Sequence, residues 1–367
     1  MSDEEIRPYR AESPQADLDD LLDRLSRTRW PDELPGVGDA YGVPLAYVRE
    51  LSEYWLTGYD WRAWEARFNA YPQFVTTIDG QDIHFFHVRS SEPDALPLIL
   101  THGWPGSVVE YLDVIEPLST GEGGVAFDLV IPSLPGYGFS GPTHETGWNR
   151  YRMAKAWAQL MRRLDYERYG AVGNDAGSMI NPELGRIDGD HMIGSHVTQI
   201  FSFPSGDPAE MADLTEEEQG QLGTLQWFYE NKFSFNQVMS QQPQTIAYGL
   251  TDSPVALLAW NAQLFGEDLD ADFVLTNVTL YWLTGTGGSA ARLYYEDAQA
   301  TPPTDPTTMP TAVAAFGGDF SGVRRFAERD HKNIVSWTTY DHGGHFAAHK
   351  VPDLLVADIR AFFGPLA

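Results

Sequence analysis

Residues 173–178 read Gly-Asn-Asp-Ala-Gly-Ser, and this stretch decides the fold. It directly follows an apolar run, residues 169–172, that is typical of a buried strand, and it precedes a stretch compatible with a helix. Small residues two before and two after a central polar residue are required where a strand turns sharply into a helix, because larger side chains would collide there. The pattern predicts a nucleophile elbow with Asp175 at its tip. An ordinary aspartate capping a helix N-terminus is the alternative interpretation.

Strands alternate with helices on both sides of this turn. Amphipathic spacing predicts helices over residues 151–164 and 353–363. Short apolar or alternating runs predict strands over residues 75–78, 83–88, 96–101, 128–132, 169–172, 311–316 and 334–340. The first two strands read as a hairpin, and the next three, at residues 96–101, 128–132 and 169–172, look buried on both faces. We therefore predict an α/β fold, a mostly parallel sheet with helices on both faces.

Two further regions have helical periodicity and divide the chain. Residues 14–70 repeat leucines and aromatic residues at spacings of three and four, and residues 204–295 do the same in the middle of the α/β pattern. We expect an N-terminal helical extension that wraps the core (1–82), a first core part (83–203), a helical lid (204–298) and a second core part (299–367).

The composition excludes several classes of function. The chain has no cysteine, which rules out disulfides, thiol nucleophiles and thiolate metal sites. A formal charge of −28 argues against binding to nucleic acid or anionic membranes. The acidic start and the lack of a long apolar stretch predict a soluble, cytoplasmic protein with no membrane partner. Whether it forms a homo-oligomer stays open.

An aspartate at the elbow implies a particular chemistry. A carboxylate with a reference pKa of about 3.9 is already ionised at neutral pH, so it attacks without a general base. Its natural target is a saturated carbon bearing a leaving group, and the product is an ester on the enzyme that must then be hydrolysed. A strained epoxide and an alkyl halide both fit as substrates.

A second segment, His102-Gly103-Trp104-Pro105-Gly106-Ser107, follows the strand predicted over residues 96–101. Glycine and proline around Trp104 favour a turn whose backbone N–H points into the pocket. Together with the N–H of Ala176 it would form an oxyanion hole with two donors. An ordinary strand-to-helix turn is the alternative.

A third segment, residues 341–346, places His345 in a glycine-flanked loop after a late strand. That is the position of the general base in an α/β-hydrolase fold, and Asp319, after the strand at residues 311–316, stands where the acid that orients the base belongs. The chain order Asp175, Asp319, His345 matches the order of nucleophile, acid and histidine in this fold. A structural histidine is the alternative for His345.

Two other motifs formally match metal and dinucleotide sites, but their surroundings argue against both. His342, His345 and His349 have spacings that could share a helix face and bind a metal, but Gly343-Gly344 argues against a helix and no HExxH pattern accompanies them. Residues 136–141 formally match a dinucleotide-binding GxGxxG, yet prolines surround the match and no helix opens after it. We therefore expect neither a metal nor a cofactor.

Taken together, these residues resemble the epoxide hydrolases of the α/β-hydrolase superfamily, in the branch with an N-terminal helical extension that includes the microsomal and juvenile hormone enzymes. The likeness covers nearly the whole chain, and we expect no membrane anchor ahead of the extension. Its motifs are PQADL at 14–18, RTRWP at 27–31, YDWR at 59–62, HGWPGS at 102–107, SLPGYGFS at 133–140, DSP at 252–254, LTNV at 275–278 and GGHFAA at 343–348.

The resemblance assigns roles to individual residues. It implies Asp175 as nucleophile, His345 as general base and Asp319 as its orienting partner, with the backbones of Trp104 and Ala176 as oxyanion donors. Family members also use two lid tyrosines to protonate the epoxide oxygen, because a phenol is a suitable donor to a leaving alkoxide.

The chain matches only one lid tyrosine, Tyr294, because Phe235 stands where the family usually has the other. Either Tyr294 acts alone, or Gln237, Tyr229 or Tyr248 substitutes, or ring opening is slow or retuned. We expect the substrate pocket to include Phe235, Gln237, His102 and Pro105.

The predicted activity is epoxide hydrolysis to a vicinal diol, with a small-molecule epoxide as partner. Abundant aromatic residues suggest an aryl or otherwise bulky epoxide, as in the metabolism of aromatic hydrocarbons or natural products. A haloalkane dehalogenase is the alternative enzyme. An inactive or repurposed relative that binds a natural product is the alternative outside catalysis.

Overall fold

The computed structural model describes residues 5–266 and 268–367, and its centre is one sheet of nine strands in the order β1-β2-β3-β5-β4-β6-β7-β8-β9. The strands β1, β2, β3 and β5 pair antiparallel, and all later neighbours pair parallel. Their bounds are β1 (Arg7–Tyr9), β2 (Gln73–Ile78), β3 (Gln81–Val88), β4 (Leu96–Thr101), β5 (Phe127–Pro132), β6 (Tyr169–Gly173), β7 (Met192–Val197), β8 (Thr311–Gly317) and β9 (Ile334–Gly343).

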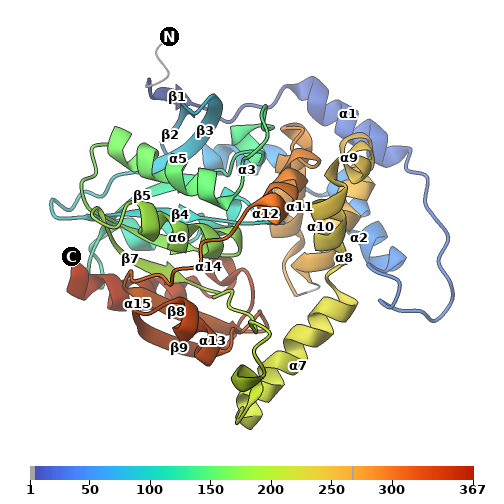
Figure 1. Cartoon of the computed structure of the whole chain (residues 1–367). Helices are drawn as coiled ribbons and strands as arrows, with labels where there is room; N and C mark the ends of the chain where they lie inside the picture. The colour runs from blue at the N-terminus through green and yellow to red at the C-terminus, as the bar shows by residue number, and fades with distance from the viewer. Residues whose placement is uncertain (1–4, 267) are drawn as a thin grey trace.

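Helices cover both faces of the sheet, as Figure 1 shows. A Cβ on Gly170 would lie 2.3 Å from the Phe363 ring of α15 (Pro352–Phe363), whereas a Cβ on Gly173 would lie 2.4 Å from the backbone of Gly177 in α6 (Ala176–Ile187). Since residues three apart in a strand point to opposite faces, α15 and α6 lie on opposite sides. The mostly parallel sheet between helices confirms the predicted α/β-hydrolase fold.

The helices of the core alternate with the strands along the chain, and the extension and the lid add further helices. Helices before the lid are α1 (Gln15–Ser26), α2 (Leu45–Thr57), α3 (Trp61–Phe68), α4 (Ile115–Ser119), α5 (Arg150–Arg163) and α6 (Ala176–Ile187). Helices of the lid are α7 (Glu216–Asn231), α8 (Ser234–Gln241), α9 (Pro243–Asp252), α10 (Pro254–Phe265), α11 (Ala271–Leu283) and α12 (Arg292–Gln299). After the lid come α13 (Arg324–Asp330), α14 (Ala347–Lys350) and α15 (Pro352–Phe363).

The N-terminal region contains strands of the main sheet as well as the predicted helices. Its helices α1, α2 and α3 are present, but β1 and β2 join the main sheet, and the predicted boundary between residues 82 and 83 falls inside β3. The hairpin cannot be divided there, because β2 and β3 are paired from residue 73 to residue 86. The N-terminal residues are therefore part of the core sheet as well as of a helical layer.

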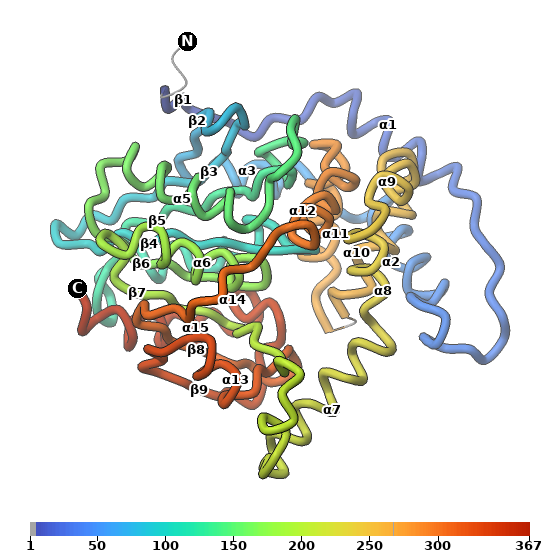
Figure 2. The backbone as a smooth tube through the Cα atoms, viewed as in Figure 1, coloured from blue at the N-terminus to red at the C-terminus, as the bar shows by residue number. Residues whose placement is uncertain are grey.

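The helical layer of the N-terminus braces the lid. Tyr54 Oη donates to the Asp272 carboxylate at 2.7 Å, and Tyr59 Oη lies 2.9 Å from Thr276 Oγ1, so both contact α11. Figure 2 shows the chain of α1 and α2 running beside α9 and α10, while α7 projects away from the body. No helix in the described part of the chain is long and apolar enough to cross a membrane.

Candidate active site

The turn between β6 and α6 presents Asp175 in a strained backbone conformation. Asp175 has φ of 50°, which an L-residue adopts only under constraint. A Cβ on Gly173 would collide with the backbone of Gly177, and a Cβ on Gly177 would lie 2.0 Å from the carbonyl oxygen of Thr101. Glycine is therefore sterically required at both positions, as expected for a nucleophile elbow.

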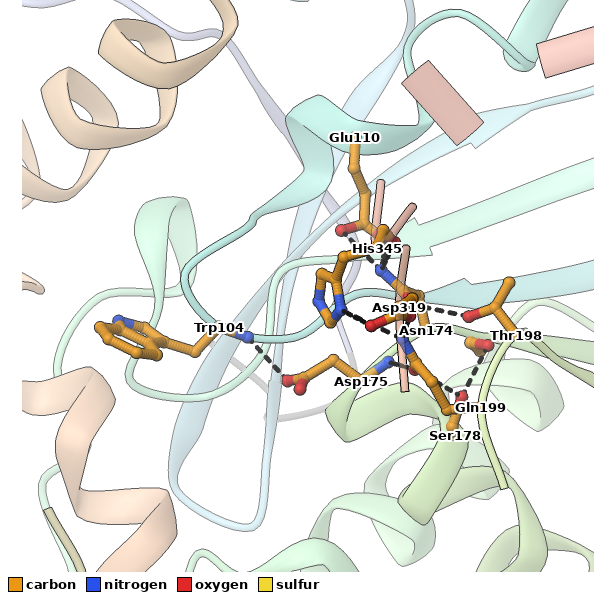
Figure 3. Close-up of polar contacts among 10 residues, drawn as sticks. Trp104, Glu110, Asn174, Asp175, Ser178, Thr198, Gln199, Asp319 and His345 are labelled. Atoms are coloured by element: carbon orange, nitrogen blue, oxygen red, sulfur yellow. Dashed lines mark hydrogen bonds and ion pairs between the residues drawn. The ribbon is translucent and has the colours of Figure 1, made fainter. Parts of the chain in front are cut away.

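The backbone of the loop after β4 holds one oxygen of the Asp175 carboxylate. The N–H of Trp104 donates to Asp175 Oδ1 at 2.9 Å, as Figure 3 shows. A Cβ on Gly103 would lie 1.9 Å from the same oxygen, so glycine is needed there for the loop to approach. Burial raises the pKa of Asp175, while His345 and the backbone N–H groups of Trp104 and Ala176 act to lower it. The two predicted oxyanion donors thus both face this carboxylate.

His345 lies beside Asp319 at the end of β9. Its Nδ1 is 3.1 Å from Asp319 Oδ1. Two glycines with positive φ, Gly343 at 119° and Gly344 at 65°, form the loop that turns the ring toward the elbow. Burial alone would lower the pKa of His345, but the negative charges of Asp319 and Asp175 outweigh it and raise the pKa to about 9. The imidazole is therefore protonated in the free protein at neutral pH.

The other two histidines of the rejected metal motif have partners of their own. His342 is exposed and pairs with Asp341. His349 lies between Asp113 at 2.7 Å and Asp270 at 2.6 Å, and it joins the core to the start of α11. The three histidines of the motif are each paired with different carboxylates.

Two buried polar residues behind the site were missed from the sequence. Gln199 accepts the N–H of Asp175 at 2.7 Å through Oε1, and its Nε2 donates to Asp319. Asn174 donates to the carbonyl oxygen of His345 at 3.1 Å and accepts from Thr198 at 2.7 Å. These side chains connect the loops after β6, β7 and β8 to the histidine loop and fix their relative positions.

Glu110 is a third residue that the sequence did not single out. It lies in the 3-10 turn Val108–Tyr111, is fully buried, and its carboxylate is 3.4 Å from Asn174 Nδ2. Burial raises its pKa to about 8, and the charge of His345 works in the opposite direction. Figure 3 shows Glu110 and Asp175 on either side of the His345 ring in that view.

Aromatic rings from the lid cover the loop that carries Trp104. The Trp104 ring stacks on Phe235 of α8 with centroids 5.3 Å apart and meets Tyr294 of α12 edge-on at 6.2 Å. Phe235 and Tyr294 also meet edge-on, at 6.0 Å. Burial raises the pKa of Tyr294 well above its usual value, and the charge of Asp175 is the next largest cause. The phenol therefore lies within electrostatic reach of Asp175.

The remaining predicted pocket residues differ in their placement. Pro105 is buried and follows a cis peptide bond. His102 is fully buried, and both of its ring nitrogens are engaged by backbone, Nδ1 with Gly103 O at 3.0 Å and Nε2 with the N–H of Leu134 at 3.2 Å. It braces two loops through these contacts, so neither ring nitrogen is free to bind a substrate.

The three side chains considered as substitutes for the second lid tyrosine are exposed. Gln237 follows Phe235 by two residues in α8, so it points to the far side of the helix, toward solvent. Tyr229 is 58% exposed and Tyr248 is 71% exposed. Their exposure corrects both the expectation that Gln237 lines the pocket and the suggestion that one of the three replaces the missing phenol.

Comparisons with known proteins agree with this arrangement. A family model described as "Epoxide hydrolase N terminus" matches residues 6–111, and one described as "alpha/beta hydrolase fold" matches residues 97–234. A putative epoxide hydrolase from Stigmatella aurantiaca is 40% identical over 98% of this chain and 85% of its own length.

Solved structures give the same result. The epoxide hydrolase of Aspergillus niger superposes with a TM-score of 0.88 at 30% identity, covering 99% of this chain and 97% of that one. Juvenile hormone epoxide hydrolase from the silkworm Bombyx mori superposes with a TM-score of 0.91 at 26% identity, covering 98% and 94%. Because a putative epoxide hydrolase is 40% identical over nearly the whole chain and both family models match, the chain belongs to the epoxide hydrolase family of the α/β-hydrolase fold.

Proposed function

We propose that this protein converts an epoxide and water to a vicinal diol through a covalent ester on Asp175. The observation that supports this most strongly is the Asp175 carboxylate at a strained turn, with one oxygen held by the Trp104 N–H and a phenol and an imidazole in electrostatic reach. Membership of the epoxide hydrolase family supports the same reaction.

In the first step the free oxygen of Asp175 attacks a ring carbon. A carbon–oxygen bond to the carboxylate forms, the strained carbon–oxygen bond of the epoxide breaks, and its electron pair stays on the departing oxygen. A phenol proton, from Tyr294 in this proposal, passes to that oxygen and leaves a phenolate. The raised pKa of Tyr294 keeps the phenol protonated until an alkoxide, a stronger base, appears beside it.

In the second step His345 removes a proton from water, and the hydroxide attacks the Asp175 carbonyl carbon. The N–H groups of Trp104 and Ala176 stabilise the oxyanion that develops. Collapse releases the diol, with His345 returning its proton to the departing oxygen. The Asp175 carboxylic acid then loses its proton, which restores the phenol, and the enzyme returns to its starting state.

We further propose an aryl or otherwise bulky epoxide as substrate. Three rings, those of Trp104, Phe235 and Tyr294, lie against one another above the nucleophile. Flat aromatic substituents gain favourable edge and face contacts with such rings. A small-molecule partner of this kind needs neither a charged binding patch nor a cofactor.

Product analysis on paired substrates tests the reaction. Styrene oxide and its larger aryl analogues are expected to give the diol, and aryl epoxides are expected to have higher kcat/KM than short alkyl epoxides. Matched alkyl halides are expected to release no halide, because the proposed donor to the leaving group is a phenol proton, which suits a basic alkoxide. Halide release without diol would replace this proposal by a haloalkane dehalogenase, and binding without turnover would replace it by a non-catalytic role.

The pH dependence of the two steps should differ. Alkylation needs ionised Asp175, and burial raises the pKa of this carboxylate. As pH is lowered, the alkylation rate should therefore begin to fall at a higher pH than it would with an ordinary aspartate. Ester hydrolysis needs neutral His345, so its rate should rise with pH. Ester formation removes the Asp175 charge that helps to hold the His345 pKa at about 9, so the apparent pKa of this step should lie below 9.

Single-turnover measurements across the pH range separate the two rates. The expected pattern is an acid limb for alkylation and a rise to a plateau for hydrolysis. A hydrolysis rate that increases as pH falls would show that His345 does not act as the base.

A further inference from the structure

Tyr137 lies behind the loop that carries Trp104. It follows β5, is 1% exposed, and its ring meets the rings of His102 at 5.8 Å and Tyr281 at 6.1 Å. His102 begins that loop, and Tyr281 Oη donates to the carbonyl oxygen of Gly106 at 2.6 Å within it. The Tyr137 ring is thus held against both ends of the catalytic loop.

The hydroxyl of Tyr137 is buried and has no hydrogen-bond partner among the residues that the structure describes. The neighbouring buried tyrosines are different, because Tyr111 donates to Thr101 O at 2.9 Å and Tyr281 donates to Gly106 O. An unpaired buried hydroxyl destabilises a fold, so such a group is expected where a ligand supplies the missing partner.

The backbone next to Tyr137 lies against the segment that leads into α12, the helix that carries Tyr294. Ser289 Oγ, three residues before α12, donates to the carbonyl oxygen of Gly136 at 2.6 Å. Tyr137 therefore lies between the catalytic loop and the start of α12. Burial raises the pKa of Tyr137 well above its usual value, and the charge of Asp175 is the next largest cause, so the phenol is within electrostatic reach of the nucleophile.

We propose that Tyr137 is the second phenol that donates to the epoxide oxygen, opposite Tyr294, and that it replaces the donor missing at Phe235. This inference rests on the proposed function. As Asp175 forms the ester bond and the ring carbon–oxygen bond breaks, the departing oxygen accepts hydrogen bonds from both phenols. One proton transfers to it, the resulting phenolate is stabilised by the other phenol, and the proton is restored when Asp175 loses its own at the end of the cycle.

The lid residues weighed as the second donor, Phe235, Gln237, Tyr229 and Tyr248, do not compete for this role. Phe235 carries no donor, and Gln237, Tyr229 and Tyr248 are exposed on the lid. A core phenol beside the catalytic loop would also make ring opening less dependent on the position of α8 than a phenol on α8 itself.

The test is Tyr137→Phe, which keeps the ring and removes only the hydroxyl. Rapid mixing with styrene oxide, followed by quenching and mass measurement of the Asp175 ester, gives the alkylation rate separately from the hydrolysis rate. We expect alkylation to slow by roughly 10- to 100-fold while hydrolysis of the ester is unchanged. The Tm should stay the same or rise, because the variant removes an unpaired buried hydroxyl.

A rescue variant and a control sharpen the result. Adding Phe235→Tyr to Tyr137→Phe is expected to restore part of the alkylation rate, because it returns a phenol to the lid. Tyr248→Phe, at an exposed lid tyrosine, is expected to behave as wild type.

Two results would overturn the role of Tyr137 while the proposed function stands. One is wild-type alkylation in Tyr137→Phe. The other is an equal loss in both steps with a lower Tm and no rescue by Phe235→Tyr, which is the signature of a structural hydroxyl. If wild-type protein itself formed neither ester nor diol, the proposed function would fail first and this inference with it.

Discussion

Asp175→Ala is expected to lower diol formation from an aryl epoxide by about 10⁴-fold or more, to the background of the uncatalysed reaction. The whole chemical sequence begins with this carboxylate, since the oxyanion donors and the histidine act on the ester that it forms. Alanine keeps the Cβ at this turn and removes only the carboxylate that the N–H groups of Trp104 and Ala176 hold. Steady-state diol formation measures the effect.

The fold should survive this substitution. Removal of a buried carboxylate with a raised pKa relieves a desolvation cost, so a cooperative thermal transition is expected for Asp175→Ala. Asp341→Asn is the matched control, because Asp341 is an exposed aspartate near the end of β9 whose carboxylate pairs with His342. Full activity in Asp175→Ala, or equal loss in Asp341→Asn, would contradict a nucleophilic role for Asp175.

His345→Gln is expected to trap the ester. Without the imidazole no group removes a proton from water, so alkylation continues while hydrolysis slows by about 10²-fold or more. The peptide that contains Asp175 should then gain the mass of one epoxide molecule, and the adduct should persist for as long as the ester is not hydrolysed. Peptide mass analysis after incubation with styrene oxide measures it.

His342→Gln is the control for this experiment. His342 lies three residues before His345, at the end of β9, but is exposed and pairs with Asp341, so its variant should accumulate no adduct. If His345→Gln lost diol formation without any adduct, although Tyr294 and Asp175 were intact, the two-step reaction would be ruled out.

The elbow could be predicted from sequence because its constraints are local. Gly173 and Gly177 are required by collisions within a few residues of Asp175, and these collisions depend on residue size alone. The glycines around His345 have the same kind of cause, since Gly343 and Gly344 adopt positive φ. Local sterics leave a pattern that is readable without knowledge of the fold.

The strand β7 was not predicted, and a functional residue was missed with it. Gly194, Ser195 and His196 interrupt its apolar character, although His196 is buried and pairs with Asp358 of α15 at 2.8 Å. Gln199 follows the carboxyl end of this strand, and ligand sites in parallel sheets lie at the carboxyl ends of the strands. Its contact with Asp175 joins residues 24 apart in sequence, and no local pattern indicates it.

The placement of Glu110, Tyr137 and the lid aromatics has the same explanation. Their position depends on packing between loops that are distant in sequence, such as the contact of the Tyr281 hydroxyl with Gly106. The sequence showed that Phe235 removes a lid donor, but it could not show that Gln237 and Tyr248 are exposed while Tyr137 is buried without a partner. The sequence therefore indicated that a lid donor is missing, and only the tertiary packing points to Tyr137 as its proposed replacement.

One measurement tests the covalent role of Asp175 most directly: a single turnover of the wild-type protein, in excess over epoxide, in water enriched in the heavy oxygen isotope. The account predicts that the heavy oxygen enters the Asp175 carboxylate and that the first diol released carries none, because the new diol oxygen comes from Asp175 itself. Heavy oxygen in that first diol, with none in the Asp175 peptide, would mean that water attacks the epoxide directly and would contradict the account.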